Sequence, residues 1–424
     1  MKGGDSMPRS VSYPSYLRPL LMCFSARGES AYPVGGCVRD TLMGTAPHDW
    51  DVAVTTVPET TMAICHAAGY RTIPTGLKHG TITVIVPHSG DPADRESPYD
   101  LIECTTCRTE GGYSDGRHPD AVSFTGRIED DLSRRDFTVN AMAFVEDGQT
   151  LAILDLFGGQ DDLHNRIIRC VGDPDTRFTE DALRLMRAVR FAVKLGFAIE
   201  PQTRAAILRQ ADGLARISRE RISDEFQKIL VSPEPERGVT LLCELGLMPY
   251  VLPEGISPCG MGDLSGLPAD FARRMACLQW GMDGSAVEKN LAGLRLSNAV
   301  RKDVLSMTRS ASMAVTVAPK CAREWRSRLG DLAIPALTVR LARASGDDET
   351  DITGLIRLAE DSIVRGEPVR IADLAVNGND LMAVGFQPGK GLQTVLQALL
   401  ETVWEFPEKN TRDELIKEAL SRKD

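Results

Sequence analysis

The sequence of 424 residues lacks the features that mark several classes of protein. It holds no run of about 18 uncharged apolar residues, so an ordinary transmembrane helix is excluded, and its start holds no apolar stretch of signal-peptide length. Its ten cysteines follow no repeated spacing, which favours reduced thiols over a disulfide framework. Together these absences predict a cytoplasmic protein.

An excess of basic charge is missing as well. The net charge of −10 and the isoelectric point near 5.3 argue against a surface coated with basic residues for indiscriminate nucleic-acid binding. A polyanionic partner would need a local basic groove, for which residues 166–194 are the best candidate. A composition of 42% hydrophobic and 25% charged residues is that of a globular protein, long enough for two to four domains.

What is present falls into two parts. Between residues 32 and 144, apolar β-branched runs bounded by Gly, Pro and Asp predict strands at WDVAVTT, GTITVIV, LIECTT and AVSF. Beyond about residue 151 the apolar residues recur at helical spacing. The expected fold class is therefore α+β, with a mixed α/β head followed by an all-helical remainder. The expected domains are a head at 15–150, a neck at 151–232, a body at 233–340 and a tail at 341–424.

The stretch HDWDVAV carries two aspartates separated by one residue. Because side chains alternate along a strand, Asp49 and Asp51 should face one way and Trp50 should pack inside. Neighbouring carboxylates repel unless a cation lies between them, and Mg²⁺ prefers oxygen ligands. Glu103, inside the strand-like run DLIECTT, is the best third ligand. An isolated Asp-x-Asp is more often an ordinary surface or turn feature, so its surroundings decide.

Two glycines precede this pair in the stretch YPVGGCVRD. Gly35 and Gly36 would let backbone amides approach an anion closely, and a following helix N-terminus favours phosphate. By itself, Gly-Gly indicates only a tight turn. Here it lies with Arg39 and the carboxylate pair within seventeen residues, which indicates a nucleoside triphosphate together with Mg²⁺.

The order of these motifs resembles that of the class II tRNA nucleotidyltransferases, the family of bacterial and eukaryotic CCA-adding enzymes and related bacterial poly(A) polymerases. The matching motifs are GG-x-VRD-x-L-x-G, Asp-x-Asp, RRDFTVNAMAF and EDALRLMRAVRFAVKLGF, which lie between about residues 32 and 230. The resemblance implies a polymerase-β-like nucleotidyltransferase head followed by a helical neck, body and tail. The C-terminal half resembles the family more loosely.

The resemblance also implies roles for single residues. The catalytic metal ligands would be Asp49, Asp51 and Glu103. The triphosphate would be held by Gly35, Gly36 and Arg39. The ribose would be recognised by Arg135, Asp136 and Asn140. The base would be read by Asp181 and Arg184, with further nucleotide contacts from Arg187 and Arg190.

The base-reading pair has a physical argument as well. A helix with Thr179 as its N-cap and Gly196 at its C-terminal end would place Arg184 and Arg187 opposite an apolar face. Asp181, three residues before Arg184, would then adjoin it on one turn. For an arbitrary helix the alternative is a solvated face with an ordinary Asp–Arg salt bridge. The next helical stretch, SRERISDEFQKIL, is expected mainly to stiffen the neck.

The chemistry of the bases favours the reading role. Cytosine and adenine each offer an amino donor beside a ring-nitrogen acceptor, whereas uracil and guanine present a carbonyl beside an N–H. An acceptor-only aspartate and a donor-only arginine therefore match C and A and mismatch U and G. A protein that selects only CTP and ATP needs no nucleic-acid template.

These observations predict addition of CCA to the 3′ end of tRNA from CTP and ATP, with release of pyrophosphate. Two Mg²⁺ ions would carry the chemistry, and the helical part would bind the acceptor and TΨC region of tRNA through shape and phosphates. No general base is required, and His48 and His79, which have no partner pattern for metal or base chemistry, are expected to be structural. Neither a membrane nor an obligate protein partner is expected.

Other products stay open within the family. An A-adding or CC-adding enzyme would work with a partner enzyme, and a poly(A) polymerase would add a tail. The stretch RTEGGYSDGRHPD at 108–120 matches a flexible loop that CC-adding forms lack, which favours CCA over CC addition without separating it from A addition. A nucleotide- or RNA-binding protein without catalysis is disfavoured, because Asp49 and Asp51 are both present.

Overall fold

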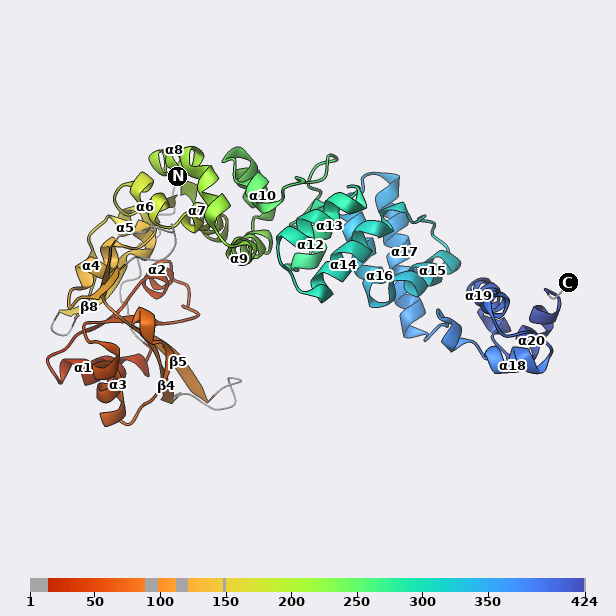
Figure 1. Cartoon of the computed structure of the whole chain (residues 1–424), viewed down its shortest axis with the longest axis horizontal. Helices are drawn as coiled ribbons and strands as arrows, with labels where there is room; N and C mark the ends of the chain where they lie inside the picture. The colour runs from red at the N-terminus through yellow and green to blue at the C-terminus, as the bar shows by residue number, and fades with distance from the viewer. Residues whose placement is uncertain (1–13, 88–97, 112–120, 148–149, 423–424) are drawn as a thin grey trace, which may run out of the picture. The chain divides into compact units, whose positions relative to one another are not determined.

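The computed structural model describes residues 14–87, 98–111, 121–147 and 150–422 (Figure 1). The chain divides into two compact units, one of Met1–Ile229 with Thr240–Tyr250 and the other of Leu230–Val239 with Val251–Asp424. The four predicted domain ranges stay a prediction. Within the described part of the chain, no helix combines the length and apolar character that crossing a membrane requires.

The first unit is built on a five-stranded sheet in the order β1-β2-β5-β4-β3. Strands β2 and β5 are parallel, and the other neighbours are antiparallel. The strands are β1 Ala31–Pro33, β2 Asp51–Val54, β3 Arg71–Gly76, β4 Thr81–Pro87 and β5 Tyr99–Thr106. The strands predicted at WDVAVTT, GTITVIV and LIECTT are thus confirmed as β2, β4 and β5.

One face of the sheet is buried and the other carries polar groups. Helix α3 (Pro58–Ala67) packs on β3, β4 and β5, and α1 (Leu17–Ser25) packs on α3 and β1. Val84 of β4 and Ile102 of β5 are fully buried, whereas Glu103, the next residue of β5, is exposed. This alternation follows from the pleat of a strand, and it leaves the second face available for functional side chains.

Two hairpins and a short parallel pair complete the strands of this unit. They are β6 Arg108–Gly111 with β7 Ala121–Phe124, β8 Met142–Asp147 with β9 Thr150–Asp155, and β10 Ile167–Ile168 with β11 Ala198–Ile199. Strand β7 confirms the prediction at AVSF. Strands β1, β3, β6, β8, β9, β10 and β11 were not predicted, and the expected head boundary at residue 150 falls in the β8–β9 hairpin.

Helices between and after these strands carry most of the site. They are α2 Gly36–Leu42, α4 Ile128–Ser133, α5 Gly159–His164, α6 Pro174–Glu180, α7 Leu183–Leu195, α8 Pro201–Gln210 and α9 Arg219–Leu230. Helix α7 is buried along most of its length, which explains its apolar pattern at helical spacing.

The predicted start of the helix that carries the base-reading pair is wrong. Asp181 has extended backbone angles (φ −142°, ψ 101°) and separates α6 from α7. Thr179 is not an N-cap, because its hydroxyl donates to the Asp175 carbonyl inside α6 at 2.8 Å. Instead, the Asp181 carboxylate accepts from the Leu183 N–H at 3.1 Å. The predicted end is confirmed, since Gly196 follows α7 with φ 69°.

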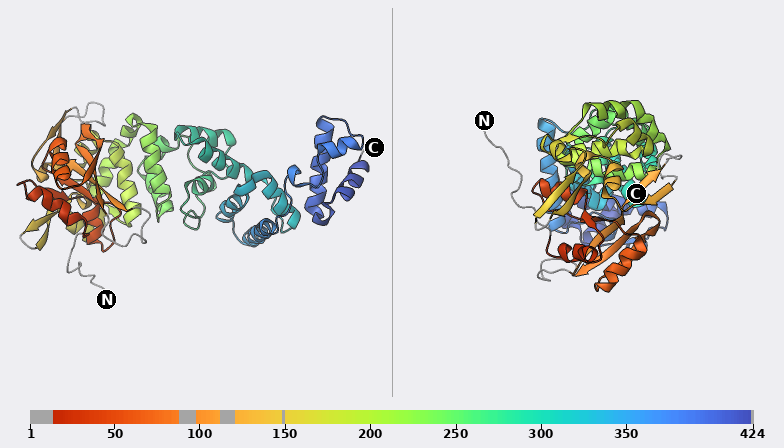
Figure 2. Two further views of the ribbon diagram at one scale, coloured as in Figure 1. Left: turned by 90° about the horizontal axis from the view of Figure 1, so that it is seen from below. Right: turned by 90° about the vertical axis from the view of Figure 1, so that its left-hand side faces the viewer.

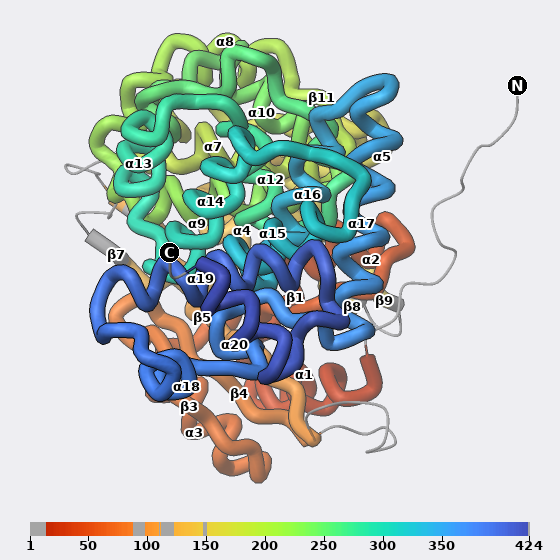
Figure 3. The backbone as a smooth tube through the Cα atoms, turned by 90° about the vertical axis from the view of Figure 1, so that its right-hand side faces the viewer, coloured from red at the N-terminus to blue at the C-terminus, as the bar shows by residue number. Residues whose placement is uncertain are grey.

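The regular elements described in the second unit are helices (Figure 2). After α10 Pro235–Glu244 and α11 Met248–Val251, which lie at the division, they are α12 Phe271–Leu278, α13 Gly284–Gly293, α14 Asn298–Arg309, α15 Pro319–Leu329, α16 Ala333–Leu341, α17 Asp347–Val364, α18 Gly378–Ala383, α19 Lys390–Glu405 and α20 Arg412–Leu420. The last three gather around a core that includes the fully buried Leu381, Leu399 and Leu415 (Figure 3). The α+β class with a helical remainder is confirmed.

Candidate active site

A cavity of about 510 Å³ lies in the first unit between α2, the start of β2, α7 and α9. Its wall contains eight basic side chains and three carboxylates, although the whole chain has a net charge of −10. The basic residues are Arg39, Arg134, Arg135, Arg184, Arg187, Arg190, Lys194 and Arg221. The carboxylates are Asp51, Asp136 and Asp181. Such an excess of cations around one cavity suits a polyanionic ligand.

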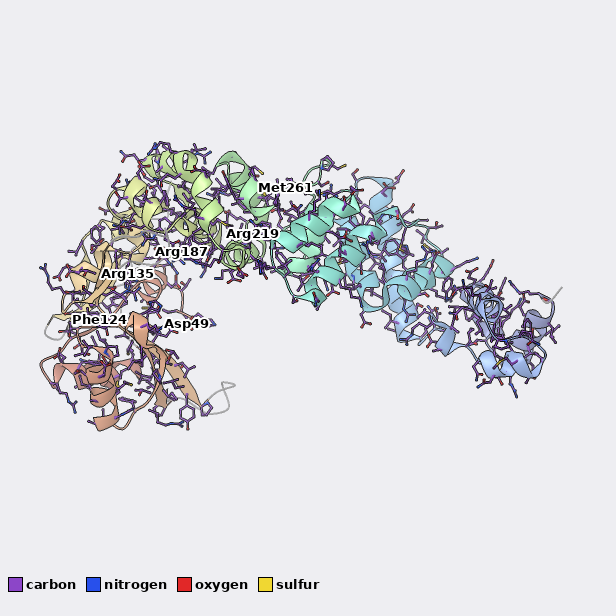
Figure 4. All side chains as sticks on the ribbon, in the orientation of Figure 1. Asp49, Phe124, Arg135, Arg187, Arg219 and Met261 are labelled. Atoms are coloured by element: carbon purple, nitrogen blue, oxygen red, sulfur yellow. The ribbon has the colours of Figure 1, made fainter. Side chains whose placement is uncertain are left out.

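Ten of the thirteen predicted site residues line this cavity, and Gly35, Asp49 and Glu103 are the three that do not. Two of the lining residues, Arg135 and Arg187 of α7, are labelled in Figure 4. The cavity also contains residues that were not predicted, namely Arg134, Leu183, Phe191, Lys194 and Arg221. Arg134 is the first residue of the predicted motif RRDFTVNAMAF, and Lys194 ends the predicted basic stretch. Arg221 lies in the stretch SRERISDEFQKIL, for which the sequence predicts mainly a stiffening role.

The two glycines have different tasks. Gly35 has φ 77° and ψ −122°, a conformation that L side chains rarely adopt, and a Cβ there would lie 2.6 Å from Nη1 of Arg135. Its N–H donates to the Met142 carbonyl at 3.0 Å, so this amide is not free to bind phosphate as predicted. Gly36 lines the cavity as the first residue of α2, where N–H groups have no partner within the helix.

Arg39 begins a buried hydrogen-bonded network. Its guanidinium donates to Asn140 Oδ1 at 2.5 Å and to Asp40 Oδ1 at 2.8 Å. Asn140 Nδ2 donates to Asp136 Oδ1 at 3.3 Å. Arg187 donates to Asp136 Oδ2 from Nε at 2.8 Å and from Nη2 at 2.6 Å. Residues from α2, the RRDFTVNAMAF motif and α7 are thus joined by one chain of contacts.

Asp136 is the centre of that network. Its Oδ1 also accepts from the Phe137 N–H at 2.8 Å, so its four acceptor positions are filled. Burial alone would raise the pKa of Asp136, but the charge and hydrogen bonds of Arg187 outweigh it and lower the pKa to about 2. The residue acts as a fixed anion that orients its neighbours, because a direct bond to ribose would require one of these contacts to break.

We expect Asp136→Asn to lower the free energy of unfolding by about 2 kcal/mol at neutral pH. An aspartate with a depressed folded pKa stabilises the fold above its unfolded pKa, and that contribution is lost as the pH falls from the ordinary 3.8 toward about 2. Denaturant unfolding at pH 7 and at about pH 3 checks this, because the gap between variant and wild type should narrow at the lower pH.

The matched control for this variant is Asp175→Asn. Asp175 also pairs with an arginine, Arg209 at 2.5 Å, but both side chains are about half exposed. Solvent screening makes such pairs weak, so the control should leave the free energy of unfolding nearly unchanged. If the free energies of unfolding of Asp136→Asn and wild type differ by the same amount at both pH values, the lowered pKa of Asp136 is contradicted.

Arg184 is held from three sides. Its Nη1 donates to Glu180 Oε2 at 2.5 Å and to the Arg177 carbonyl at 3.0 Å, and its Nη2 donates to the Arg134 carbonyl at 3.0 Å. These contacts leave it only 9% exposed, which disfavours the alternative of a solvated face with an ordinary Asp–Arg salt bridge. They do not use its Nε–H or the second N–H of Nη2, which therefore remain as donors for a ligand.

Asp181 has its own partner. Arg221 donates to Asp181 Oδ2 at 2.7 Å and to Oδ1 at 3.3 Å. Oδ1 also accepts from the Leu183 N–H at 3.1 Å, so both of its acceptor positions are used and one position remains on Oδ2. Arg184 lines the same cavity, which places an acceptor and a donor together as the sequence predicts.

Phe191 lies among three guanidinium groups. Its ring centroid is 4.4 Å from Cζ of Arg190, 5.4 Å from that of Arg187 and 5.5 Å from that of Arg39. Burial, and next the charge of Arg187, lower the pKa of Arg190, although Glu225 lies 2.9 Å away. Cations crowded in this way are stabilised by an anion, which again favours a phosphate-bearing ligand.

Of the three predicted metal ligands, only two lie opposite each other on the sheet. Asp51 and Glu103 occupy paired positions on the parallel strands β2 and β5. Asp49 lies before β2, so the predicted alternation within one strand does not apply to it, whereas Trp50 is buried as predicted. His48 Nδ1 lies 2.8 Å from Asp49 Oδ1, so this histidine, predicted to be structural, touches a predicted metal ligand.

The fit of a divalent metal can be tested on these groups. Reduced solvation, and next the negative charge of Glu103, raise the pKa of Asp51 even though Arg135 opposes them. A cation would relieve this repulsion, and carboxylate oxygens suit a hard ion. Over the described ranges, however, no three His, Cys, Asp or Glu side chains are placed so that they could hold a metal ion. The ligand set of Asp49, Asp51 and Glu103 stays a prediction.

Comparisons with known proteins place these features in a family. The family model of the poly A polymerase head domain matches residues 31–169, and that of the probable RNA and SrmB-binding site of polymerase A matches residues 196–257. A CCA-adding enzyme of Limosilactobacillus fermentum is 34% identical over 413 residues, 95% of each chain. One of Latilactobacillus sakei is 35% identical over 413 residues, 95% of this chain and 96% of its own.

Solved structures of CCA-adding enzymes also resemble this chain. A Bacillus stearothermophilus CCA-adding enzyme in complex with CTP is 32% identical and has a TM-score of 0.78, with 97% of this chain and 98% of that chain covered. A Thermotoga maritima CCA-adding enzyme complexed with tRNA shares the fold, with a TM-score of 0.70 at 19% identity and coverage of 98% and 97%. Membership implies nucleotidyl transfer that depends on a divalent metal. The chain therefore belongs to the CCA-adding enzymes, the family of tRNA nucleotidyltransferases.

Proposed function

We propose that this chain adds C, C and A in turn to the 3′ end of tRNA, taking CTP twice and ATP once without a template. The observation that carries the proposal is the cavity in which Asp181 offers acceptors and Arg184 offers donors. Cytosine and adenine match that order of groups, and uracil and guanine reverse it. One pair of side chains can therefore accept both correct nucleotides and reject both others.

The rest of the nucleotide has matching groups in the same cavity. The N–H groups at the start of α2, beginning with Gly36, and the basic lining would hold the triphosphate. Asn140 keeps one amide N–H beyond its bonds to Arg39 and Asp136, which suits a ribose hydroxyl. Arg135 would assist, while Asp136 orients both neighbours. Gly35 would contribute its backbone turn.

Mg²⁺ is the proposed metal, held by Asp51 and Glu103 with Asp49 from the loop before β2. When bound, such ions lower the pKa of the attacking 3′-hydroxyl and neutralise the leaving pyrophosphate. The protein presents the carboxylate oxygens beside the cavity, and its arginines hold the phosphates that leave. No side chain needs to act as a general base.

The proposed macromolecular substrate is the acceptor and TΨC region of tRNA, bound by the helical part through shape and phosphates. Because phosphate contacts release counterions, the affinity should fall as salt concentration rises. No protein partner is required by this scheme. A cytoplasmic location stays our prediction from the sequence.

Full CCA addition is favoured over the other products. The curated relatives that match over almost the whole chain are named CCA-adding enzymes. The loop expected to separate CCA-adding from CC-adding forms begins with β6, and residues 112–120 lie outside the described residues. The argument from that loop therefore stays a prediction.

Incorporation on defined tRNA ends tests the proposal. The purified protein is incubated with Mg²⁺ and tRNA transcripts that end before CCA, after C or after CC, with labelled CTP, labelled ATP or both. We expect CC from CTP alone and CCA from both nucleotides, with UTP and GTP used at least about a hundredfold less well. Extension of only the CC-ended transcript by one A would identify an A-adding enzyme. A long tail from ATP alone would identify a poly(A) polymerase.

A further inference from the structure

Asp181 is held by a residue from a different helix. Arg221, near the start of α9, donates to both oxygens of the Asp181 carboxylate, at 2.7 and 3.3 Å. The two side chains are 25% and 18% exposed, so the pair is partly shielded from water. Both residues line the cavity. The Asp181 carboxylate, which is proposed to accept from the base, is thus already paired with a guanidinium.

Arg184 forms a second ion pair, with Glu180 rather than with Asp181. Its Nη1 lies 2.5 Å from Glu180 Oε2, and both of these side chains are largely buried. These four charged side chains therefore form two ion pairs, Asp181 with Arg221 and Glu180 with Arg184. Asp181 and Arg184 are three residues apart and would attract each other if they were free. A mutual pair would occupy the acceptor and donor positions that read the base.

We propose that Arg221 is a positioning residue that sets base specificity by orienting Asp181 toward the base and keeping it apart from Arg184. The inference rests on the proposed base-reading role of Asp181. A two-point contact from a planar guanidinium fixes the plane of the carboxylate as well as its charge. One acceptor position then remains on Oδ2 for the amino group of C or A, because Oδ1 already accepts from both Arg221 and the Leu183 N–H.

The same orientation explains rejection of the wrong base. Uracil presents a carbonyl oxygen where cytosine presents its amino group, and a fixed carboxylate repels that oxygen. A carboxylate that can rotate away, or turn to Arg184, loses this repulsion together with the favourable bond to cytosine. Removal of Arg221 should therefore weaken CTP use and reduce discrimination against UTP at the same time.

Helix α9 makes two ion pairs with the chain around α7 from one of its faces. Glu225, four residues after Arg221, pairs with Arg190 of α7 at 2.9 Å. Positions i and i+4 lie side by side on a helix, so α9 presents a cation and an anion to α6–α7 in one row. This goes beyond the stiffening that the sequence predicts for the stretch.

The test is Arg221→Met, assayed by competition between CTP and UTP for a tRNA that ends before CCA. We expect kcat/KM for CTP to fall at least about tenfold, as for loss of a hydrogen bond to a charged group, and the preference for CTP over UTP to fall by a similar factor. Arg221→Lys, which restores the charge without the two-point contact, should recover less of the preference than of the CTP activity.

Arg209→Met is the matched control. Arg209 also donates to an aspartate, Asp175, from Nε at 3.3 Å and Nη2 at 2.5 Å, but it lies outside the cavity. It should leave the preference for CTP over UTP unchanged. If Arg221→Met slows all nucleotides equally and keeps the wild-type preference, Arg221 is only structural and the proposal fails. If Arg221→Met does not fold, the preference of Arg221→Lys decides, and a wild-type value there overturns the proposal.

Asp181→Asn separates this inference from the proposed function. Because Arg221 acts through Asp181, adding Arg221→Met to Asp181→Asn should lower the preference little further. If Asp181→Asn alone leaves the preference unchanged, the base-reading function fails. If Asp181→Asn changes the preference and Arg221→Met does not, the base-reading function stands and only the role of Arg221 fails.

Discussion

Asp51→Asn is expected to reduce nucleotide incorporation at least about a thousandfold while leaving the protein folded and able to bind tRNA. The amide has nearly the size of the carboxylate but carries no negative charge, so it cannot help to hold a divalent cation opposite Glu103. Single-nucleotide incorporation at saturating CTP measures the loss. Filter binding of the unextended tRNA measures the affinity that should remain.

The same substitution should not destabilise the metal-free protein. Reduced solvation, and next the charge of Glu103, raise the pKa of Asp51. An aspartate whose folded pKa is raised opposes folding once the pH exceeds its unfolded pKa, and a neutral amide removes that opposition. With a chelator at pH 7, the midpoint of thermal unfolding of the variant should therefore equal or exceed that of wild type. Added Mg²⁺ should raise the unfolding midpoint of wild type more than that of the variant.

Glu146→Gln is the control for this result. Glu146 is a half-exposed carboxylate of β8 outside the cavity, 3.7 Å from Arg18, and its loss should leave incorporation unchanged. Substantial turnover by Asp51→Asn with Mg²⁺ would contradict the metal assignment. A parallel loss of tRNA affinity and of the unfolding midpoint would show instead that Asp51 supports the fold.

The strands of the head could be predicted because their signal is local. In β4 and β5 the buried Val84 and Ile102 alternate with outward-facing residues, and that period of two is visible in a few consecutive letters. The motifs around Asp136 and Arg187 could likewise be recognised as blocks. Ten of the thirteen residues predicted from such motifs line one cavity.

The contacts between blocks could not be predicted. Apolar residues at helical spacing continue past the break at Asp181, whose carboxylate is paired with Arg221, forty residues away. A helical wheel considers one helix, so it could not predict the burial of Arg184, which comes partly from the Arg134 carbonyl. Gly35 matched a phosphate-binding motif, but a motif does not reveal that its N–H is used by Met142.

Gly35→Ala is expected to reduce incorporation at least about a hundredfold, although alanine adds only one methyl group. The angles φ 77° and ψ −122° are strained for any L residue, at a cost on the order of 1–3 kcal/mol. The new Cβ would also lie 2.6 Å from Nη1 of Arg135, whose bond to the Asn140 carbonyl is 3.3 Å long. Arg135 must then move within the proposed ribose site, so kcat/KM for CTP should fall.

Two other glycines separate the causes of that loss. Gly28 has a similar φ of 73° with open space where an added methyl group would lie, so Gly28→Ala should lower the unfolding midpoint and keep incorporation. In Gly36→Ala the Cβ would lie 3.6 Å from Nη2 of Arg39, an ordinary contact, so its effect should be smaller than that of Gly35→Ala. If Gly28→Ala loses as much activity as Gly35→Ala, general backbone strain accounts for the loss. If Gly36→Ala loses more, crowding at the start of α2 matters more to the nucleotide than the position of Arg135.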